Sequence, residues 1–319
     1  MSNMVVNTNI LALNSHRALK NVGVNQSRAS ARLSSGLRVN SAADDAAGLA
    51  ISEKMRSQIR GLDQASRNTQ DGASLIQTAE GGITEISNMV QRIRELTVQA
   101  SNDTNQAIDR EKIGLEIGQL LQEIEEMASR VEFNNMTLLD GTMTGKNLQV
   151  GANARQMIGF GIKSMNVAGL GMDTVFNNAL GVSFTVDFSI PAGTPGAFTV
   201  SDFAAAFGNL TSTEISELLR IDADPTTIPP TPMGGIDGTL SIISEQRATL
   251  GALQNRLEYT IRSLDISSEN LSASESRIRD ADMAKEMMKL TQSNVLQQAA
   301  ISMLAQGNQS PQSILQLLS

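Results

Sequence analysis

A seven-residue repeat of aliphatic side chains in the last quarter of the chain constrains the fold more than any other feature. Residues seven apart lie on one face of a helix, and a strict repeat of this kind marks a helix that winds against a partner. Such a helix is stabilised by packing rather than by its own propensity, although an amphipathic helix of an unrelated bundle is an alternative. The repeat consists of Ile243, Leu250, Leu257, Leu264, Leu271 and Ile278.

Two further apolar repeats in the first half of the chain can cover this stripe. Both advance by steps of three and four residues, which keeps the side chains on one helix face. We therefore predict that helices over 76–100 and 107–131 pack against 243–278, which brings the two chain ends together. The repeats are Ile76, Ala79, Ile83, Ile86, Val90, Ile93, Thr97 and Ala100, and then Ile113, Ile117, Leu120, Ile124, Met127 and Val131.

The first of these helices is predicted to be long. Ser41-Ala-Ala-Asp44 has the form of a capping box and favours a helix start at this point. We expect the helix to run from 44 to 100, although Gly81 and Gly82 each reduce helix propensity by about 1 kcal/mol relative to Ala.

The middle of the chain, about 141–236, has a different pattern. Short apolar runs with Gly predict small strands at 148–153 and 157–162, and strict alternation predicts another at 182–190. Thr211-Ser-Thr-Glu214 favours a capped short helix, and four Pro between 224 and 235 indicate a stiff connector. We interpret this region as a small, mostly β insertion between two helical ends.

Composition and chemistry exclude several classes of function. The net charge of −8 argues against a nucleic-acid binder, and no apolar run reaches the roughly 18 residues that span a membrane. The absence of Cys excludes disulfides, and the amino terminus lacks the features of a cleaved secretory signal. The single His, His16, has no companion nucleophile or metal ligand. We therefore expect neither an enzyme nor a cofactor or metal.

The two ends of the chain, 1–39 and about 280–319, are helical in pattern but weakly amphipathic. Ordering a residue costs roughly 1–2 kcal/mol of backbone entropy, which these segments cannot offset alone. We expect them to fold on assembly, when neighbouring copies bury their apolar side chains. The residues concerned are Ile10, Leu13, Leu296, Met303, Leu304, Leu315 and Leu318.

Several motifs at both ends closely resemble bacterial flagellin. The resemblance covers about 1–165 and 236–319, and the motifs occur in the same order as in that family. At the amino end they are Asn7-Thr-Asn-Ile-Leu-Ala-Leu-Asn14, Leu33-Ser-Ser-Gly36, Asp44-Asp-Ala-Ala-Gly-Leu-Ala-Ile-Ser52 and Gln91-Arg-Ile-Arg-Glu-Leu-Thr-Val-Gln99. At the carboxyl end they are Leu250-Gly-Ala-Leu-Gln-Asn-Arg256, Glu269-Asn-Leu-Ser272, Ser276-Arg-Ile-Arg-Asp-Ala-Asp282, Leu296-Gln-Gln-Ala-Ala300 and Leu304-Ala-Gln306.

The resemblance implies a mainly α fold, with a long antiparallel helical bundle or coiled coil from both ends and a small central insertion. It implies five segments. They are an inner-layer helix over 1–40, a helical second-layer domain with short hairpins over 41–170, a variable outer insertion over 171–235, a helix over 236–279 that completes the second layer, and an inner-layer helix over 280–319.

The implied function is that of a structural subunit of the extracellular flagellar filament, exported unfolded and assembled at the tip. The implied partners are other copies of the chain, an export chaperone, junction and cap proteins, and a Toll-like innate receptor at Arg92, Leu96 and Glu116. Neither nucleic acid nor membrane is expected. The alternatives are a hook–filament junction protein and a filament subunit whose insertion acts as an adhesin.

Overall fold

The computed structural model describes residues 9–173, 175–176, 200–219 and 235–318. The chain forms two compact units, one made of Met1–Arg60 with Ile266–Ser319 and the other of Gly61–Asp265. We call them the terminal unit and the central unit and describe each separately. The long helices α2 (Ala46–Ala100) and α7 (Ile236–Arg279) contribute residues to both units. The mainly α fold class predicted from the sequence is confirmed.

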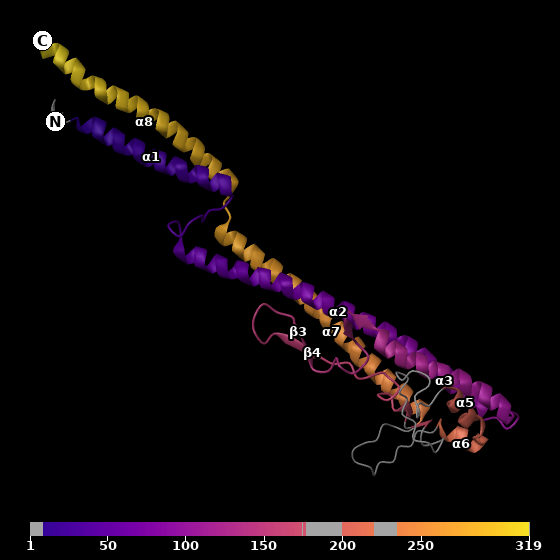
Figure 1. The fold of residues 1–319 in the computed structure, drawn as a ribbon. Coiled ribbons are helices and arrows are strands. Elements are labelled where there is room, and N and C mark those ends of the chain that lie inside the picture. The colour runs from indigo at the N-terminus through magenta and orange to yellow at the C-terminus, as the bar shows by residue number, and fades with distance from the viewer. Residues whose placement is uncertain (1–8, 174, 177–199, 220–234, 319) are drawn as a thin grey trace. The chain divides into compact units, whose positions relative to one another are not determined.

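In the central unit, α2 and α7 run antiparallel in a constant register. Arg94 Nε donates to Asp237 Oδ1 over 2.6 Å, and Ser66 Oγ donates to Asp265 Oδ1 over 3.0 Å. The two contacts lie 28 residues apart in each helix (66 to 94 and 237 to 265), which equals four seven-residue repeats. The same apolar positions therefore face each other along this length. The third long helix of the unit is α3 (Ala107–Arg130) (Figure 1).

The apolar repeats form the core of the central unit. All eight predicted positions of α2 are buried, and α2 is continuous through Gly81 and Gly82. On α7, Ile243, Leu250 and Leu257 are each 1% exposed. These residues, apart from Thr97, join the buried side chains of α3 in one hydrophobic cluster, as the matching periods predicted.

Three of the six residues predicted for the buried seam of α3 are only partly buried, and one of them is Val131, just after the helix ends. Ile113, Ile117 and Ile124 are buried as predicted, but Leu121 and Ala128 are buried where Leu120 and Met127 were predicted. Leu120 and Met127 are only partly buried and pack at the edge of the core. A helix with adjacent apolar residues offers two possible seams, and the contacts with the other elements decide between them.

Two antiparallel hairpins follow α3. Strand β1 (Glu132–Phe133) pairs with β2 (Met136–Thr137). The turn between them places Asn134 and Asn135 at φ 50° and 60°, as a two-residue I′ hairpin requires. Strand β3 (Lys146–Gln149) pairs with β4 (Met157–Phe160), with Leu148 opposite Ile158. The predicted strands at 148–153 and 157–162 thus exist with shifted bounds, whereas 182–190 and the Pro-rich stretch 224–234 lie outside the described residues.

Helix α5 (Val200–Gly208) packs directly on α3. A Cβ atom added to Gly118 would lie 2.8 Å from Val200 Cγ1, and one added to Gly114 would lie 3.0 Å from Phe207 Cβ. These glycines therefore allow the two helices to approach closely. The ring of Phe203 stacks on that of Phe207 and meets that of Phe176 edge to face, and all three residues are at most 1% exposed.

Helix α6 (Ser212–Glu217) begins at the predicted capping box. Thr211 Oγ1 accepts from Glu214 N, and Glu214 Oε2 accepts from Thr211 N over 2.8 Å. Ile215 and Leu218 are buried in the main core. The described part of 171–235 therefore contributes to the same core as the long helices.

In the terminal unit, α1 (Ile10–Ser35) and α8 (Met283–Leu318) lie side by side (Figure 1). The connectors that follow α1 and precede α8 are tied together by an antiparallel bridge between Leu37 and Asp280. Arg38 N donates to Arg279 O over 2.7 Å, and Ala281 N donates to Gly36 O over 2.9 Å. The ends of α1 and α8 nearest the connectors are therefore held close together.

The predicted capping box at Ser41–Asp44 does not start α2. Asp44 Oδ2 accepts from Ser41 N over 3.2 Å within a turn, whereas Asp45 Oδ1 accepts from Gly48 N over 2.9 Å at the first turn of the helix. Asp45 therefore caps α2, which begins at Ala46. Asp44 and Asp45 are adjacent and either carboxylate could cap a helix. The path of the connector places Asp45 at the first turn of α2.

Candidate assembly interface

Small and polar side chains form the contact between α1 and α8. Ala29 of α1 is 4% exposed, and Glu286 and Ser293 of α8 are 5% and 9% exposed. Among the described side chains of these two helices, no large apolar residue is buried to the same degree. Packing between α1 and α8 alone therefore leaves the larger apolar side chains exposed or only partly buried.

Polar contacts along the pair fix which residues of α1 and α8 meet. Asn9 Nδ2 donates to Gly307 O over 2.7 Å, and Gln26 Nε2 donates to Asn294 Oδ1 over 2.7 Å. Arg32 Nη1 lies 3.9 Å from Glu286 Oε1, which also accepts from Lys289 Nζ over 2.5 Å. Since residue numbers rise along α1 and fall along α8, the two helices are antiparallel.

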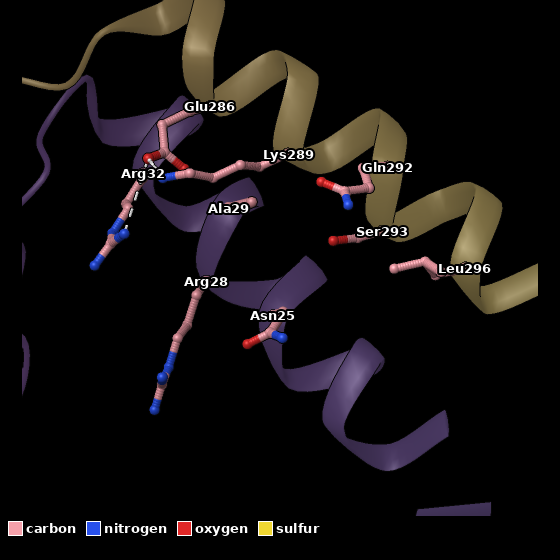
Figure 2. A pocket seen from close by; sticks show the side chains of 9 residues that line it. All are labelled: Asn25, Arg28, Ala29, Arg32, Glu286, Lys289, Gln292, Ser293 and Leu296. Atoms are coloured by element: carbon pink, nitrogen blue, oxygen red, sulfur yellow. Dashed lines mark hydrogen bonds and ion pairs between the residues drawn. The ribbon is translucent and has the colours of Figure 1, made fainter. Parts of the chain in front are cut away.

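An open groove of about 320 Å³ lies between the helices beside Glu286. Figure 2 shows Asn25 and Ala29 on α1 opposite Gln292, Ser293 and Leu296 on α8. The groove exists because the side chains that meet at this level are short. Its remaining lining residues are Arg28, Arg32, Glu286 and Lys289.

Several large apolar residues of this pair are instead exposed. Ile10 and Leu13 of α1 are 54% and 58% exposed, and Leu296 and Met303 of α8 are 48% and 58% exposed. Leu304 is partly buried, and the side chains of Leu315 and Leu318, also predicted for this contact, lie outside the part that the structure describes. Other exposed apolar residues of the pair are Val24, Met283, Met287, Met288, Val295 and Ile301. Exposed apolar area on this scale marks a surface that other molecules cover.

The predicted packing residues of α7 lie in a different environment. Ile243, Leu250, Leu257 and Leu264 are at most 8% exposed and belong to the interior of the central unit. Leu271, in the terminal unit, is partly buried. The four buried residues pack the chain against itself.

The three residues predicted as receptor contacts lie on α2 and α3 of the central unit. Arg92 Nη2 lies 2.8 Å from Glu116 Oε1, and both side chains are about half exposed. The hydrogen bonds that Arg92 donates to Glu116 and Glu95 raise the pKa of its guanidinium above its usual value. Leu96 is 2% exposed, so it supports the helix pair from within and offers little area to a partner.

An ion-pair network that the sequence did not reveal lies next to the connectors of the terminal unit. Arg279 Nη1 lies 2.5 Å from Glu53 Oε1, and Arg56 pairs with Glu275 over 3.7 Å. The hydrogen bond from Arg279 holds the pKa of the Glu53 carboxyl below its usual value. These four charged residues lie among other polar residues on long helices. The sequence therefore contains no pattern that distinguishes them from ordinary surface charges.

The described residues contain no group of His, Cys, Asp or Glu arranged to hold a metal ion. None of the described helices has the length and apolar character that spanning a membrane requires. The terminal unit presents a pair of helices with several exposed apolar side chains, and the central unit is a helical bundle with a buried core. Exposed apolar side chains of this kind are typical of helical proteins that assemble with other molecules.

Comparison with known proteins identifies the family. The model of the bacterial flagellin N-terminal helical region matches residues 6–144, and that of the bacterial flagellin C-terminal helical region matches residues 233–318. The chain is 46% identical over 318 residues to a flagellin of Halalkalibacterium halodurans, covering 99% of this chain and 100% of that protein. It is likewise 46% identical over 334 residues to a flagellin of Bacillus subtilis, with 99% and 100% coverage.

A third relative is the flagellar filament 33 kDa core protein of Treponema phagedenis, which is 41% identical over 325 residues, with 99% of this chain and 100% of that protein covered. Because these matches extend over the length of the chain and of its relatives, the chain belongs to the bacterial flagellin family. Flagellins are structural proteins of the filament and not enzymes.

Proposed function

We propose that this chain polymerises with copies of itself into the extracellular flagellar filament, and that the outward surface of α1 and α8 is the main assembly surface. As a flagellin, the chain is a structural subunit that serves swimming motility. The alternatives of a junction protein or an adhesin are not favoured, since the matched flagellins are covered from end to end.

One observation carries the proposed assembly surface. α1 and α8 bury small and polar residues against each other and expose Ile10, Leu13, Leu296 and Met303. Burial of apolar area contributes about 25 cal/mol per Å², so copies that cover these side chains gain the stabilisation that the isolated pair lacks. We therefore propose that α1 and α8 form the inner layer of the filament.

The same reasoning supports a layered division of the subunit. We propose inner-layer helices over 1–40 and 280–319, a second layer over 41–170 with 236–279, and an outer insertion over 171–235. The support is the contrast in side-chain exposure: α1 and α8 expose their apolar residues, whereas the seams of α2, α3 and α7 in the central unit are buried.

Exposed apolar side chains on α8 also require protection before assembly. We propose that an export chaperone covers the carboxyl-terminal helix, and that junction and cap proteins contact the same kind of surface at the two ends of the filament. The support is that α8 exposes several Met, including Met287 and Met288 at 49% and 66%, and flexible Met side chains suit surfaces that accept different partners.

We further propose that an innate receptor of the Toll-like class contacts the exposed Arg92–Glu116 pair, with Leu96 supporting it from the core. Arg92→Ala should weaken binding of the monomer to the receptor, because it removes the guanidinium that a partner would contact. Arg247→Ala, at an exposed arginine of α7, is the matched control. Unchanged receptor signalling by a folded Arg92→Ala monomer would remove this assignment.

Electron microscopy of the purified chain tests the main proposal. Monomer seeded with short filament fragments should grow into long filaments that sediment. A chain that stays monomeric under seeding, or that forms only short rods of fixed length, would contradict the proposal of a major filament subunit.

A further inference from the structure

Tyr259, the only Tyr in the chain, is displayed on the surface of α7 in the central unit. Its side chain is 68% exposed. The other aromatic side chains in the described residues are Phe and are partly or fully buried: Phe133, Phe160, Phe176, Phe203 and Phe207. An exposed aromatic side chain in a protein with 3% aromatic residues therefore requires an explanation beyond core packing.

The guanidinium of Arg262 lies over this ring. Its Cζ atom is 4.5 Å from the ring centroid of Tyr259, within the range of a cation–π contact. Arg262 Nε donates to Glu258 O over 3.4 Å, and among the described residues its terminal nitrogens have no carboxylate partner. Several other arginines of the structure pair with carboxylates, among them Arg56, Arg92, Arg94, Arg130 and Arg279.

The stack is on the side of α7 that faces away from the core. Tyr259 follows the buried Leu257 by two residues, and Arg262 precedes the buried Leu264 by two. Two residues correspond to about 200° around a helix of 3.6 residues per turn. Ala252 and Asn255, which share this outer face, are exposed and smaller. The stack is therefore larger than these neighbours on the same face.

We propose that Tyr259 and Arg262 bind a second copy of the chain in the filament, with the ring covered by the neighbour and the guanidinium paired with one of its carboxylates. This proposal rests on the proposed function. The complementarity of charge supports it, because the chain has 33 acidic and 25 basic residues and the described residues place no carboxylate in an ion pair with Arg262. Tyr and Arg are also the residues that most often dominate the binding energy of interfaces.

Polymerisation assays test the contribution of the stack. Tyr259→Ala and Arg262→Gln should each raise the monomer concentration in equilibrium with filaments by about tenfold, the effect of losing a moderate interface hot spot. Arg247→Gln, at another exposed arginine of α7, should leave it unchanged. Because the side chains are exposed, thermal unfolding of the monomers should not change. Equal assembly by all four proteins would overturn the proposal.

A cross-linking experiment tests the carboxylate partner directly. Filaments of the Arg262→Lys variant, grown from a mixture of ordinary and nitrogen-15-labelled chains, are treated with a carbodiimide, which joins an amine to a carboxylate in contact. We expect a cross-linked pair of peptides in which position 262 of one peptide is joined to an Asp or Glu of the other. One peptide of the pair should carry the label and the other should not, because they come from different chains. Cross-links from position 262 confined to single chains, or none at all, would overturn the proposal.

Tyrosine fluorescence supplies an independent measurement, since the chain has one Tyr and no Trp. Quenching by iodide should fall strongly when monomers enter filaments, because the neighbour covers the ring. Equal quenching in monomer and filament would overturn the proposal. These outcomes are distinct from failure of the proposed function, in which the unaltered chain itself would form no filaments.

Discussion

Asn9 Nδ2 donates a 2.7 Å hydrogen bond to the carbonyl oxygen of Gly307, a residue 298 positions later in the chain. With the contact between Gln26 and Asn294, it fixes the register of α1 on α8 through polar groups. Polar side chains therefore set the register of the helix pair, and the exposed apolar side chains remain available for contacts with other molecules.

Polar substitutions at the exposed apolar surface should block assembly without unfolding the subunit. Leu296→Asp combined with Met303→Asp places charges where neighbouring copies would bury apolar area, and an unpaired buried charge is strongly unfavourable. We expect sedimentable filaments to fall below a tenth of the unaltered amount, with an unchanged monomer melting curve. Gln298→Asp, on the same helix, serves as the control for added charge.

Filament yields of the double variant close to those of the unaltered chain would show that this surface remains open in the polymer. A reduced melting temperature of the monomer would instead place Leu296 and Met303 in the fold of the subunit.

Two adjacent glycines of α2 should respond oppositely to alanine. A Cβ atom at Gly81 meets nothing within 4 Å, whereas one at Gly82 would lie 2.9 Å from Leu139 Cδ1 and from Val131 Cγ2. Gly81→Ala should therefore stabilise the central unit by about 1 kcal/mol through helix propensity. Gly82→Ala should gain the same helix propensity, but the added methyl group overpacks the core, which typically costs about 1–3 kcal/mol. The central unit should therefore not be stabilised. Urea denaturation of both variants measures the difference, and equal stabilities would contradict the close packing around Gly82.

The aromatic cluster next to α3 should be necessary for the stability of the central unit. Phe207 is fully buried and stacks on Phe203 at a centroid distance of 5.9 Å. Phe207→Ala should destabilise the unit by about 3–5 kcal/mol, as a large cavity in a core does. Chemical denaturation measures this value. A loss below about 1 kcal/mol would mean that α5 is not part of the core, and Phe133→Ala, at a partly buried ring, is the comparison.

Acid should loosen the connectors of the terminal unit. The folded-state pKa of Glu53 lies below the reference value of 4.5 because Arg279 donates a hydrogen bond to it. A lowered folded-state pKa stabilises the fold above the unfolded-state value, and this stabilisation is lost as the pH falls through the folded-state pKa. Between about pH 5 and pH 3, the protection of the amides in 36–39 and 279–281, measured relative to their intrinsic exchange rates at each pH, should therefore fall.

In Glu53→Gln, the amides in 36–39 and 279–281 should already be less protected than in the unaltered chain at about pH 6. Their protection should then change less on acidification. Glu269→Gln, at an exposed residue of α7, is the control. The same pH dependence in Glu53→Gln and the unaltered chain would assign the effect to other groups, among them Asp44, whose pKa is lowered by the backbone hydrogen bond from Ser41.

The elements that could be predicted from the sequence are those in which apolar side chains repeat at helical spacing. Ile76 to Ala100 and Ile243 to Leu264 follow one period over several turns, and burial follows the period. The interface of α1 with α8 could not be predicted in this way, because Ala29, Ser293 and Glu286 have no common pattern. Only the three-dimensional approach of the two helices shows that these small and polar residues are the buried ones.

Short sequence motifs predicted the position of a helix cap or a core residue correctly only where a single residue could fill that position. Thr211-Ser-Thr-Glu214 is one isolated capping box, and it caps α6. At the start of α2, Ser41, Asp44 and Asp45 all have the chemistry of a cap, and the connector between Gly36 and Ala46 determines that Asp45 is used. In α3, Leu120 and Leu121 compete in the same way for one place in the core.

Removal of residues 300–319 tests the role of the terminal helices most directly. The truncated chain loses Gly307, the partner of Asn9, and the exposed Ile301 and Met303, while the central unit, Gly61–Asp265, keeps all of its residues. Sedimentation after seeding, with the thermal unfolding curve of the same sample, measures both consequences. We expect no filaments and a thermal transition of the central unit that is nearly unchanged. Filaments formed by the truncated chain would contradict assembly through α1 and α8.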